Sequence, residues 1–194
     1  KKKFPNIIFI AVQSGYRSFY RDFFLQLKKL KKLGKIDNLR ADHIFLYGKA
    51  IEPQYAKYIN FKASYLGSYR NNSVTVAKNK EKKKTLLFIS QWRNNQWLKD
   101  HKFTVENKLL PILQNFCEEK KFELSILGTQ LAKKEKREEF LFFSNLLPKK
   151  NWNFIERKSL LSNFKIIDKF NLITFVDSTL GYESIARKKK IAVF

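Results

Sequence analysis

Residues 172–194 read LITFVDSTLGYESIARKKKIAVF and contain the repeating unit of the fold. The continuous apolar run at 172–176 is typical of a strand that is buried on both faces. A turn then leads to Ser178, a residue type suited to begin a helix, and an apolar strand follows at 191–194. Because two parallel strands need a crossover connection, this order of strand, helix and strand predicts a parallel βαβ unit.

The same alternation runs through the rest of the chain. Apolar runs of strand length occur at 7–12, 43–47, 63–66, 85–90, 123–127 and 152–155. Segments with helical spacing or helix-forming composition lie between them, at 19–33, 53–59, 104–120, 133–144 and 160–169. The run at 7–12 is continuously apolar, so it too predicts a strand buried on both faces. The pattern as a whole predicts an α/β fold built from Rossmann-like parallel-sheet units.

A polar, lysine-rich segment divides this pattern into two parts. Residues 78–84 contain no apolar side chain, and the alternation restarts directly after them. We expect residues 1–72 to belong to one unit and 85–194 to a second, with 73–84 as a basic linker. The chain has no methionine and stops on an apolar strand. We therefore expect a portion of a longer protein, with the first unit incomplete and the second truncated at its C-terminus.

Composition excludes several classes of protein. The chain has 194 residues with 40 Lys and Arg against 17 Asp and Glu, a formal charge of +23, but it is also 44% hydrophobic and is expected to fold. One cysteine and two histidines exclude a disulfide framework and a Cys/His zinc site, so no metal is expected. The apolar runs are too short to span a membrane, and no signal peptide is recognisable, which predicts a cytoplasmic protein.

The loops that follow the strands are the places to look for a ligand site, because ligands of open parallel sheets bind beyond the carboxyl ends of the strands. Ser178 and Thr179 offer hydroxyl groups at the start of a helix, where backbone N–H groups and the helix dipole attract phosphate. Glu183, about one helical turn later, can accept hydrogen bonds from a ribose. The alternative stays open that Ser178 only caps the helix and that Gly181 serves packing.

Other candidates come from the remaining loops. A guanidinium group after a strand can bind phosphate or an acidic acceptor, and an ordinary surface role is the alternative. The Gly128-Thr129-Gln130 turn can contact a base or a phosphate, with simple turn formation as its alternative. The candidates in these loops are Gln13, Ser14, Gly15, Arg17, Arg70, Arg93, Gly128 and Thr129.

The stretch 173–191 resembles the donor-binding segment of GT-B glycosyltransferases that build bacterial surface carbohydrate. That segment has an apolar strand, Ser-Thr, then Gly-Tyr-Glu, an alanine, a turn and a short strand. The stretches 10–17, 41–48 and 66–72 are similar to the closing third of the N-terminal domain in the same group. The resemblance implies a two-domain fold in which the first unit is the acceptor side and the second binds a nucleotide sugar.

Carried over by position, the resemblance implies that Ser178, Thr179 and Gly181 bind the donor phosphate and that Glu183 binds the ribose. It also implies that Gln13, Ser14 and Gly15 face the interdomain cleft. Related enzymes often have a histidine just before this glycine, whereas Gln13 and Ser14 are not good bases, so the catalytic residue stays unassigned. Lys188 and Lys189 replace the usual glycine in the turn after the helix.

These observations predict a glycosyltransferase that moves a sugar from a nucleotide sugar to a surface polysaccharide or a lipid-linked acceptor. Transfer of a polyol phosphate from a CDP-glycerol-type donor is the alternative within the same chemistry. The +23 charge also fits a nucleic-acid-binding protein, but the lysines are dispersed and no RRM, KH or helix-turn-helix signature is present. Basic helices such as the one at 28–32 can instead hold an enzyme on the inner, anionic face of a membrane.

Overall fold

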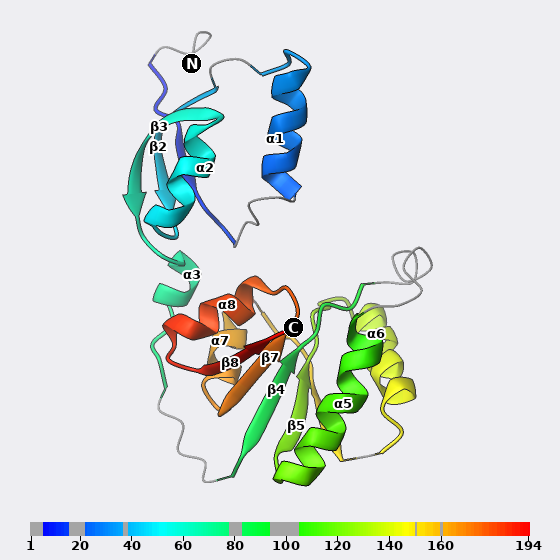
Figure 1. Ribbon diagram of the computed structural model, residues 1–194. Coiled ribbons are helices and arrows are strands. Elements are labelled where there is room, and N and C mark those ends of the chain that lie inside the picture. Colours follow the sequence, from blue (N-terminus) through cyan, green and yellow to red (C-terminus); the bar gives the residue numbers. More distant parts are fainter. Residues whose placement is uncertain are drawn as a thin grey trace. The chain divides into compact units, whose positions relative to one another are not determined.

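A computed structural model describes residues 6–15, 22–36, 39–77, 83–93, 105–149, 151–159 and 161–194 (Figure 1). The chain divides into two compact units, residues 1–73 and residues 74–194. The first unit holds a three-stranded sheet in the order β1-β2-β3, and the second a five-stranded sheet in the order β6-β5-β4-β7-β8. Every strand pair in both sheets is parallel. This confirms the predicted α/β class with two parallel-sheet units.

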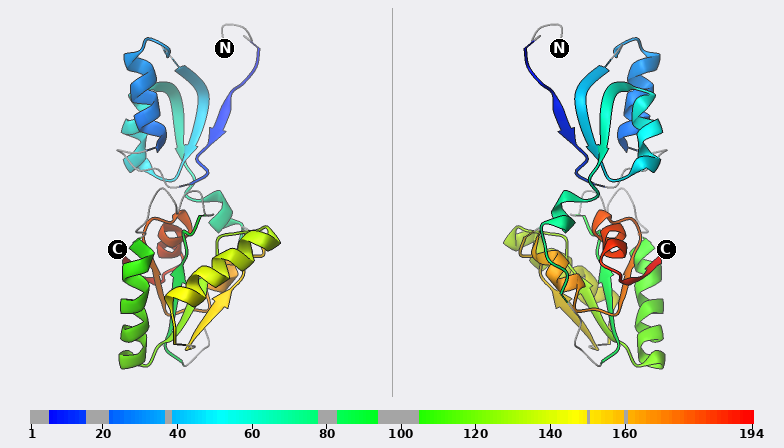
Figure 2. Two further views of the ribbon diagram at one scale, coloured as in Figure 1. Left: turned by 90° about the vertical axis from the view of Figure 1, so that its right-hand side faces the viewer. Right: turned by 90° about the vertical axis from the view of Figure 1, so that its left-hand side faces the viewer.

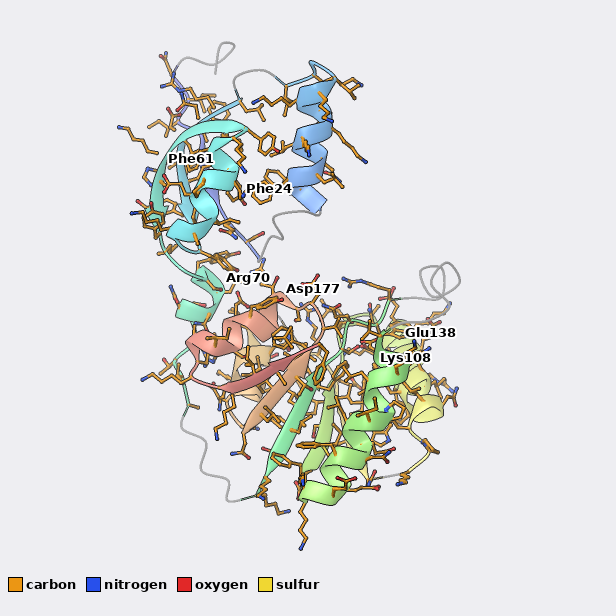
Figure 3. The ribbon with its side chains drawn as sticks, in the orientation of Figure 1. Phe24, Phe61, Arg70, Lys108, Glu138 and Asp177 are labelled. Atoms are coloured by element: carbon orange, nitrogen blue, oxygen red, sulfur yellow. The ribbon has the colours of Figure 1, made fainter. Side chains whose placement is uncertain are left out.

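Helices cover one face of the sheet in the first unit. Its elements are β1 (Ile10–Val12), α1 (Asp22–Lys32), β2 (Leu39–Leu46), η1 (Lys49–Ile51), α2 (Glu52–Ala56), β3 (Ile59–Tyr65) and α3 (Tyr69–Asn72). Helices α1 and α2 lie on the same side of the three strands (Figure 2). Phe24 of α1 and Phe61 of β3 point into the core between helices and sheet (Figure 3). The helix predicted over 53–59 ends earlier, because Ile59 already begins β3.

Strand β1 corrects the expectation that the run at 7–12 is buried on both faces. All three residues of β1 are exposed, and the exposed fractions of Ile8 and Ile10 are 72% and 62%. The strand is the edge of its sheet and pairs only with β2, where Ile10 lies opposite His43. The core of this unit forms instead between the two helices and the side chains of β2 and β3. Apolar composition identified the strand but not its position in the sheet.

Helices cover both faces of the sheet in the second unit (Figure 1). Its elements are β4 (Thr85–Ile89), α5 (Val105–Lys120), β5 (Glu123–Leu127), α6 (Lys133–Leu146), β6 (Trp152–Ile155), α7 (Ser162–Ile167), β7 (Leu172–Phe175), α8 (Thr179–Ala186) and β8 (Lys190–Val193). Leu86 and Phe88 of β4 pack with α5 and α6, while Leu87 and Ile89 pack with α7 and α8. Because successive side chains of a strand point to opposite faces, a strand covered on both faces is apolar at consecutive positions, as β4 is from Leu86 to Ile89.

A buried ion pair fixes the first residues of the second unit. The guanidinium of Arg187 donates to both carboxylate oxygens of Asp168, at 2.8 and 2.5 Å, and to the carbonyl oxygens of Val74 (3.0 Å) and Thr75 (3.2 Å). The amide of Ala77 donates to the same carboxylate at 2.8 Å. Arg187 and Asp168 are both fully buried. Residues 74–77 lie in the segment expected to be a linker, and here they are held against the second unit by this pair.

Within the described ranges, no helix is both long enough and apolar enough to cross a lipid bilayer.

Candidate functional site

The start of α8 lies at the carboxyl edge of the five-stranded sheet. Strand β7 ends at Phe175, and a bend that includes Asp177, labelled in Figure 3, leads to Ser178. The backbone of Ser178 is extended, and its hydroxyl oxygen accepts a hydrogen bond from the amide of Gly181 at 3.4 Å. Ser178 is therefore the N-cap of α8. The first amides of such a helix and its dipole together make this edge attractive to an anion.

Gly181 is required by packing. A Cβ atom at this position would lie 2.3 Å from Cγ of Phe175, well inside van der Waals contact. The absence of a side chain lets α8 lie directly on β7, where the rings of Phe175 and Tyr182 meet edge to face at 5.0 Å between centroids. The packing alternative considered for Gly181 is thus supported by the structure, and its predicted part in phosphate binding stays a prediction.

We expect the Gly181→Ala variant to lower the free energy of unfolding by about 1–3 kcal/mol, because the new methyl group must displace the ring of Phe175. The direction of the change in stability distinguishes a tightly packed glycine from an open one. In an open helical position the same substitution would stabilise the protein by up to about 1 kcal/mol. Chemical unfolding of the variant beside the wild type measures the difference, and a stabilised variant would show that this contact is not tight.

Glu183 lies farther along α8 than the expected phosphate site and is buried. Its neighbour Ser184 is also buried and donates its hydroxyl to the carbonyl oxygen of Gly181 at 2.5 Å. Only a small part of Glu183 is open to solvent, so a ribose contact requires a ligand that reaches this part. The predicted ribose contact stays a prediction.

A buried carboxylate, Glu139, organises the loops after β4 and β5. One of its oxygens accepts hydrogen bonds from the Ser90 hydroxyl (2.7 Å) and from the Thr129 amide (2.9 Å). The other accepts from the Gln130 amide at 3.2 Å. A Cβ atom on Gly128 would come within 2.9 Å of this carboxylate, so the glycine lets the loop close over it. Burial raises the pKa of Glu139, and the three groups that donate to it oppose that rise.

This arrangement gives the predicted Gly128 and Thr129 site a structural role. The amides of Thr129 and Gln130 donate to Glu139, and the carbonyl oxygen of Thr129 accepts from Arg157 at 2.8 Å. Sequence reasoning missed Glu139, although a signal exists. Glu139 stands four residues before the core residue Phe143 on α6, and a carboxylate on the apolar face of a helix needs buried donors. The predicted nucleotide contact of this turn stays a prediction.

A second buried carboxylate lies at the beginning of α5. Glu106 accepts a hydrogen bond from the amide of Gln91, in the loop after β4, at 2.8 Å. Burial raises the pKa of Glu106 to about 7, against the lowering effects of that hydrogen bond and of the positive charge of Arg93. The two carboxylates Glu106 and Glu139 thus hold the loops beyond β4 and β5 at this edge of the sheet.

The raised pKa of Glu106 predicts a pH-dependent stability. In the unfolded chain this carboxyl ionises near its ordinary value of 4.5, so folding favours the protonated form. Its contribution is fully present below that value and is lost as the pH rises through about 7. We expect Glu106→Gln to gain about 1–3 kcal/mol relative to the wild type between pH 4.5 and pH 8. Urea unfolding at several pH values in this range measures the free energy of unfolding of the variant and of the wild type. Glu119→Gln, at an exposed position of α5, is the control. If the free energies of Glu106→Gln and of the wild type change with pH in the same way, the prediction is wrong.

Arg93 and Trp92 end the described part of the loop after β4. Trp92 is a buried core residue, and its indole N–H has no hydrogen-bond partner among the residues that the structure describes. Arg93 is exposed. Strand β4 is the direct neighbour of β7, so the loop that carries Arg93 starts one strand spacing, about 4.8 Å, from the loop that carries Ser178. Arg93 is the predicted arginine whose strand is paired with β7, and its recorded electrostatic interaction is with Glu106 at the start of α5.

A basic hollow of about 1010 Å³ lies at the outer edge of the same sheet. It is lined by Leu131, Lys133, Lys134, Lys136, Arg137, Phe140, Phe154 and Glu156. Lys136 pairs with Glu156 at 3.2 Å, while the other cations lie along the first turns of α6. Strand β6 is three strand spacings from β7, about 14 Å, so this hollow is separate from the start of α8. The sequence indicated only a charged helix here.

In the first unit, Gln13 connects two loops at the carboxyl edge of its sheet. Its amide oxygen accepts from the amide of Tyr47, and its amide nitrogen donates to the carbonyl of Gly15, both at 3.0 Å. Gln13 is therefore buried as a structural residue, while Ser14 is exposed and Gly15 half-buried. The cleft role predicted for these three residues stays a prediction.

The two arginines predicted for the first unit have different outcomes. Arg70 lies in α3 beyond the end of β3, and its guanidinium donates to the Tyr69 hydroxyl at 3.1 Å and packs over that ring. Arg17 lies outside the described residues.

Across the parts of the chain that the structure describes, no three His, Cys, Asp or Glu side chains gather as a metal site would require.

The sequence was compared with curated proteins and with models of protein families. No curated protein matches the chain. The model of one protein family, described as "putative O-antigen biosynthesis protein", matches residues 10–194 and thus spans both sheets. A match of this extent links the chain to the synthesis of a surface polysaccharide. The chain belongs to this O-antigen biosynthesis family.

Proposed function

We propose that the protein is a glycosyltransferase of surface polysaccharide synthesis and that its second unit binds the diphosphate of a nucleotide-sugar donor at the start of α8. One observation carries the proposal: a serine-capped helix begins directly at the carboxyl edge of a parallel sheet. Ligands of open α/β sheets bind at this edge, and phosphates favour helix N-termini. The family membership supplies the polysaccharide setting.

The chemistry required of such a site is mainly electrostatic. When the sugar leaves, negative charge develops on the departing nucleotide diphosphate, and preorganised donors that meet this charge lower the barrier. The start of α8 would supply the Ser178 and Thr179 hydroxyls and the helix dipole. Arg93, on the neighbouring loop after β4, would supply a positive charge. Glu139 and Glu106 would act through the loops that they hold, as positioning residues.

A panel of donors tests the proposal and identifies the class of donor. We would incubate the full-length protein with UDP-, GDP-, CDP- and dTDP-sugars and with CDP-glycerol, and measure release of the nucleotide. Nucleoside diphosphate released from a sugar donor supports the glycosyltransferase. Nucleoside monophosphate released from CDP-glycerol indicates transfer of a polyol phosphate at the same site. Neither turnover nor binding of any donor would refute both.

A further inference from the structure

Helix α1 presents a strongly basic face that the proposed donor site does not use. Lys28, Lys29 and Lys32 are exposed on this helix. Leu25 and Leu33 flank them, with exposed fractions of 42% and 66%. The opposite side of the helix carries Phe24 and Leu27 into the core of the first unit. The helix thus has one apolar face that is buried and one exposed face on which cations and aliphatic side chains alternate.

The lysines of α1 do not stand alone, because a lysine from another element joins them. A hollow of about 370 Å³ is lined by Lys28, Lys31, Lys32, Lys57 and Tyr58, and by no acidic residue. Lys57 caps the end of α2. The ammonium group of Lys31 donates to the carbonyl oxygen of Lys57 at 3.1 Å and lies 5.9 Å from the centre of the Tyr58 ring. Four lysines therefore line one concave site, and the ammonium group of Lys57 also donates to the side-chain oxygen of Gln54 at 2.9 Å.

Little negative charge balances this group. In the described ranges, no carboxylate forms an ion pair with any of the four lysines, since the recorded pairs all lie in the second unit. An acidic residue, Glu52, lines an adjoining hollow, where it accepts a hydrogen bond from the Tyr65 hydroxyl. Exposed cations that lie close together repel one another, and an anion that binds among them relieves this repulsion. The surface is therefore complementary to phosphate groups.

We propose that this α1 basic face, formed by Leu25, Lys28, Lys29, Lys31, Lys32, Leu33 and Lys57, docks the first unit on the anionic phospholipid headgroups of a bilayer. A lipid phosphate would enter the hollow among the four lysines. The exposed leucines distinguish a bilayer from a nucleic acid, because aliphatic side chains gain free energy by entering the acyl boundary and gain little from bases. The proposal is independent of the donor site in the second unit.

The first experiment removes charge. Full-length protein is sedimented with vesicles of phosphatidylcholine alone or mixed with phosphatidylglycerol. We expect binding only to the anionic vesicles, and the triple variant Lys28→Gln, Lys32→Gln, Lys57→Gln should bind them about 100-fold more weakly. The matched control removes three exposed lysines of the second unit, as Lys108→Gln, Lys120→Gln, Lys165→Gln. The control has the same net charge and should lose no more than about threefold.

The second experiment removes apolar surface without changing charge. We expect Leu25→Ser with Leu33→Ser to weaken binding to the anionic vesicles about tenfold. Ile112→Ser, at a position 64% exposed on α5, is the control and should bind as the wild type does. Circular dichroism and unfolding of each variant show that the fold is retained.

Three results would overturn the proposal. The first is equal binding to neutral and anionic vesicles. The second is an equal loss in the two triple-lysine variants, which would show that net charge acts without a defined surface. The third is a loss of RNA binding in the α1 variant with vesicle binding unchanged, which would assign this surface to a nucleic acid. Donor turnover by the α1 variant in lipid-free buffer should be normal, so failure of this proposal is distinguishable from failure of the glycosyltransferase assignment.

Discussion

Replacing Arg187 with methionine is expected to lower the free energy of unfolding of the second unit by about 3–5 kcal/mol. The guanidinium is fully buried and donates hydrogen bonds to Asp168, Val74 and Thr75. Its removal leaves the buried carboxylate of Asp168 without its charged partner, and takes a donor from the buried carbonyl of Val74 and from the partly buried carbonyl of Thr75. Few single substitutions in a domain of this size have so large an effect.

Urea unfolding followed by tryptophan fluorescence measures this loss. Arg137→Met, at an exposed arginine of α6 in the same unit, is the matched control and should change stability by less than about 0.5 kcal/mol. The double variant Arg187→Met, Asp168→Leu should recover part of the loss, because it removes the stranded charge. If Arg187→Met unfolds like the control, the ion pair does not hold residues 74–77 in the way described.

The same pair predicts acid sensitivity. Burial raises the pKa of Asp168, but the hydrogen bonds and charge of Arg187 outweigh it and hold the pKa below its usual 3.8. The stabilisation is therefore present above that value and is lost as the pH falls below it.

The second large effect is expected at the start of α8. Ser178→Asp keeps a good N-cap, since aspartate caps helices as well as serine, so stability should change by less than about 0.5 kcal/mol. The new carboxylate would stand where the donor diphosphate is proposed to bind. Loss of a phosphate-facing donor together with charge repulsion should lower kcat/KM for the nucleotide-sugar donor by about 100-fold or more.

The control for this variant adds the same charge elsewhere. Asn115→Asp lies on the exposed side of α5 and should leave kcat/KM unchanged within about twofold. Steady-state kinetics on the donor selected by the panel compares the two variants. A Ser178→Asp enzyme with wild-type kinetics would move the donor site away from α8, whatever the reaction proves to be.

Much of the second unit could be predicted from sequence because helices cover both faces of its sheet, so its central strands are apolar at consecutive positions. The run at 85–90 is continuously apolar from Leu86 to Ile89, and the structure places it as β4 in the middle of the sheet. The run at 7–12 has the same composition, but β1 is an edge strand with exposed side chains. An apolar composition indicates that a segment forms a strand. How far its side chains are buried depends on the strands and helices that pack beside it, and these elements are distant in sequence.

In the candidate site too, features that depend on local sequence could be predicted and features that depend on distant contacts could not. The position of Ser178 as the cap of α8 was predictable, because a capping residue between an apolar strand and a helix is a local signal. Glu139, Glu106 and the pair of Arg187 with Asp168 were not predicted. Their partners are separated by 9 to 113 positions in the chain, so only the folded structure brings them together. A local pattern can place a carboxylate such as Glu139 on the apolar face of a helix, but it does not identify the distant groups that complete the network.

The central claim is that the start of α8 binds the donor diphosphate, and a crystal structure of the protein with the nucleoside diphosphate selected by the donor panel tests it most directly. We predict electron density for the two phosphates within hydrogen-bond distance of the Ser178 and Thr179 hydroxyls and of the first amides of α8. Density for the diphosphate at another place, such as the basic hollow beside Lys133 and Arg137, would contradict the account.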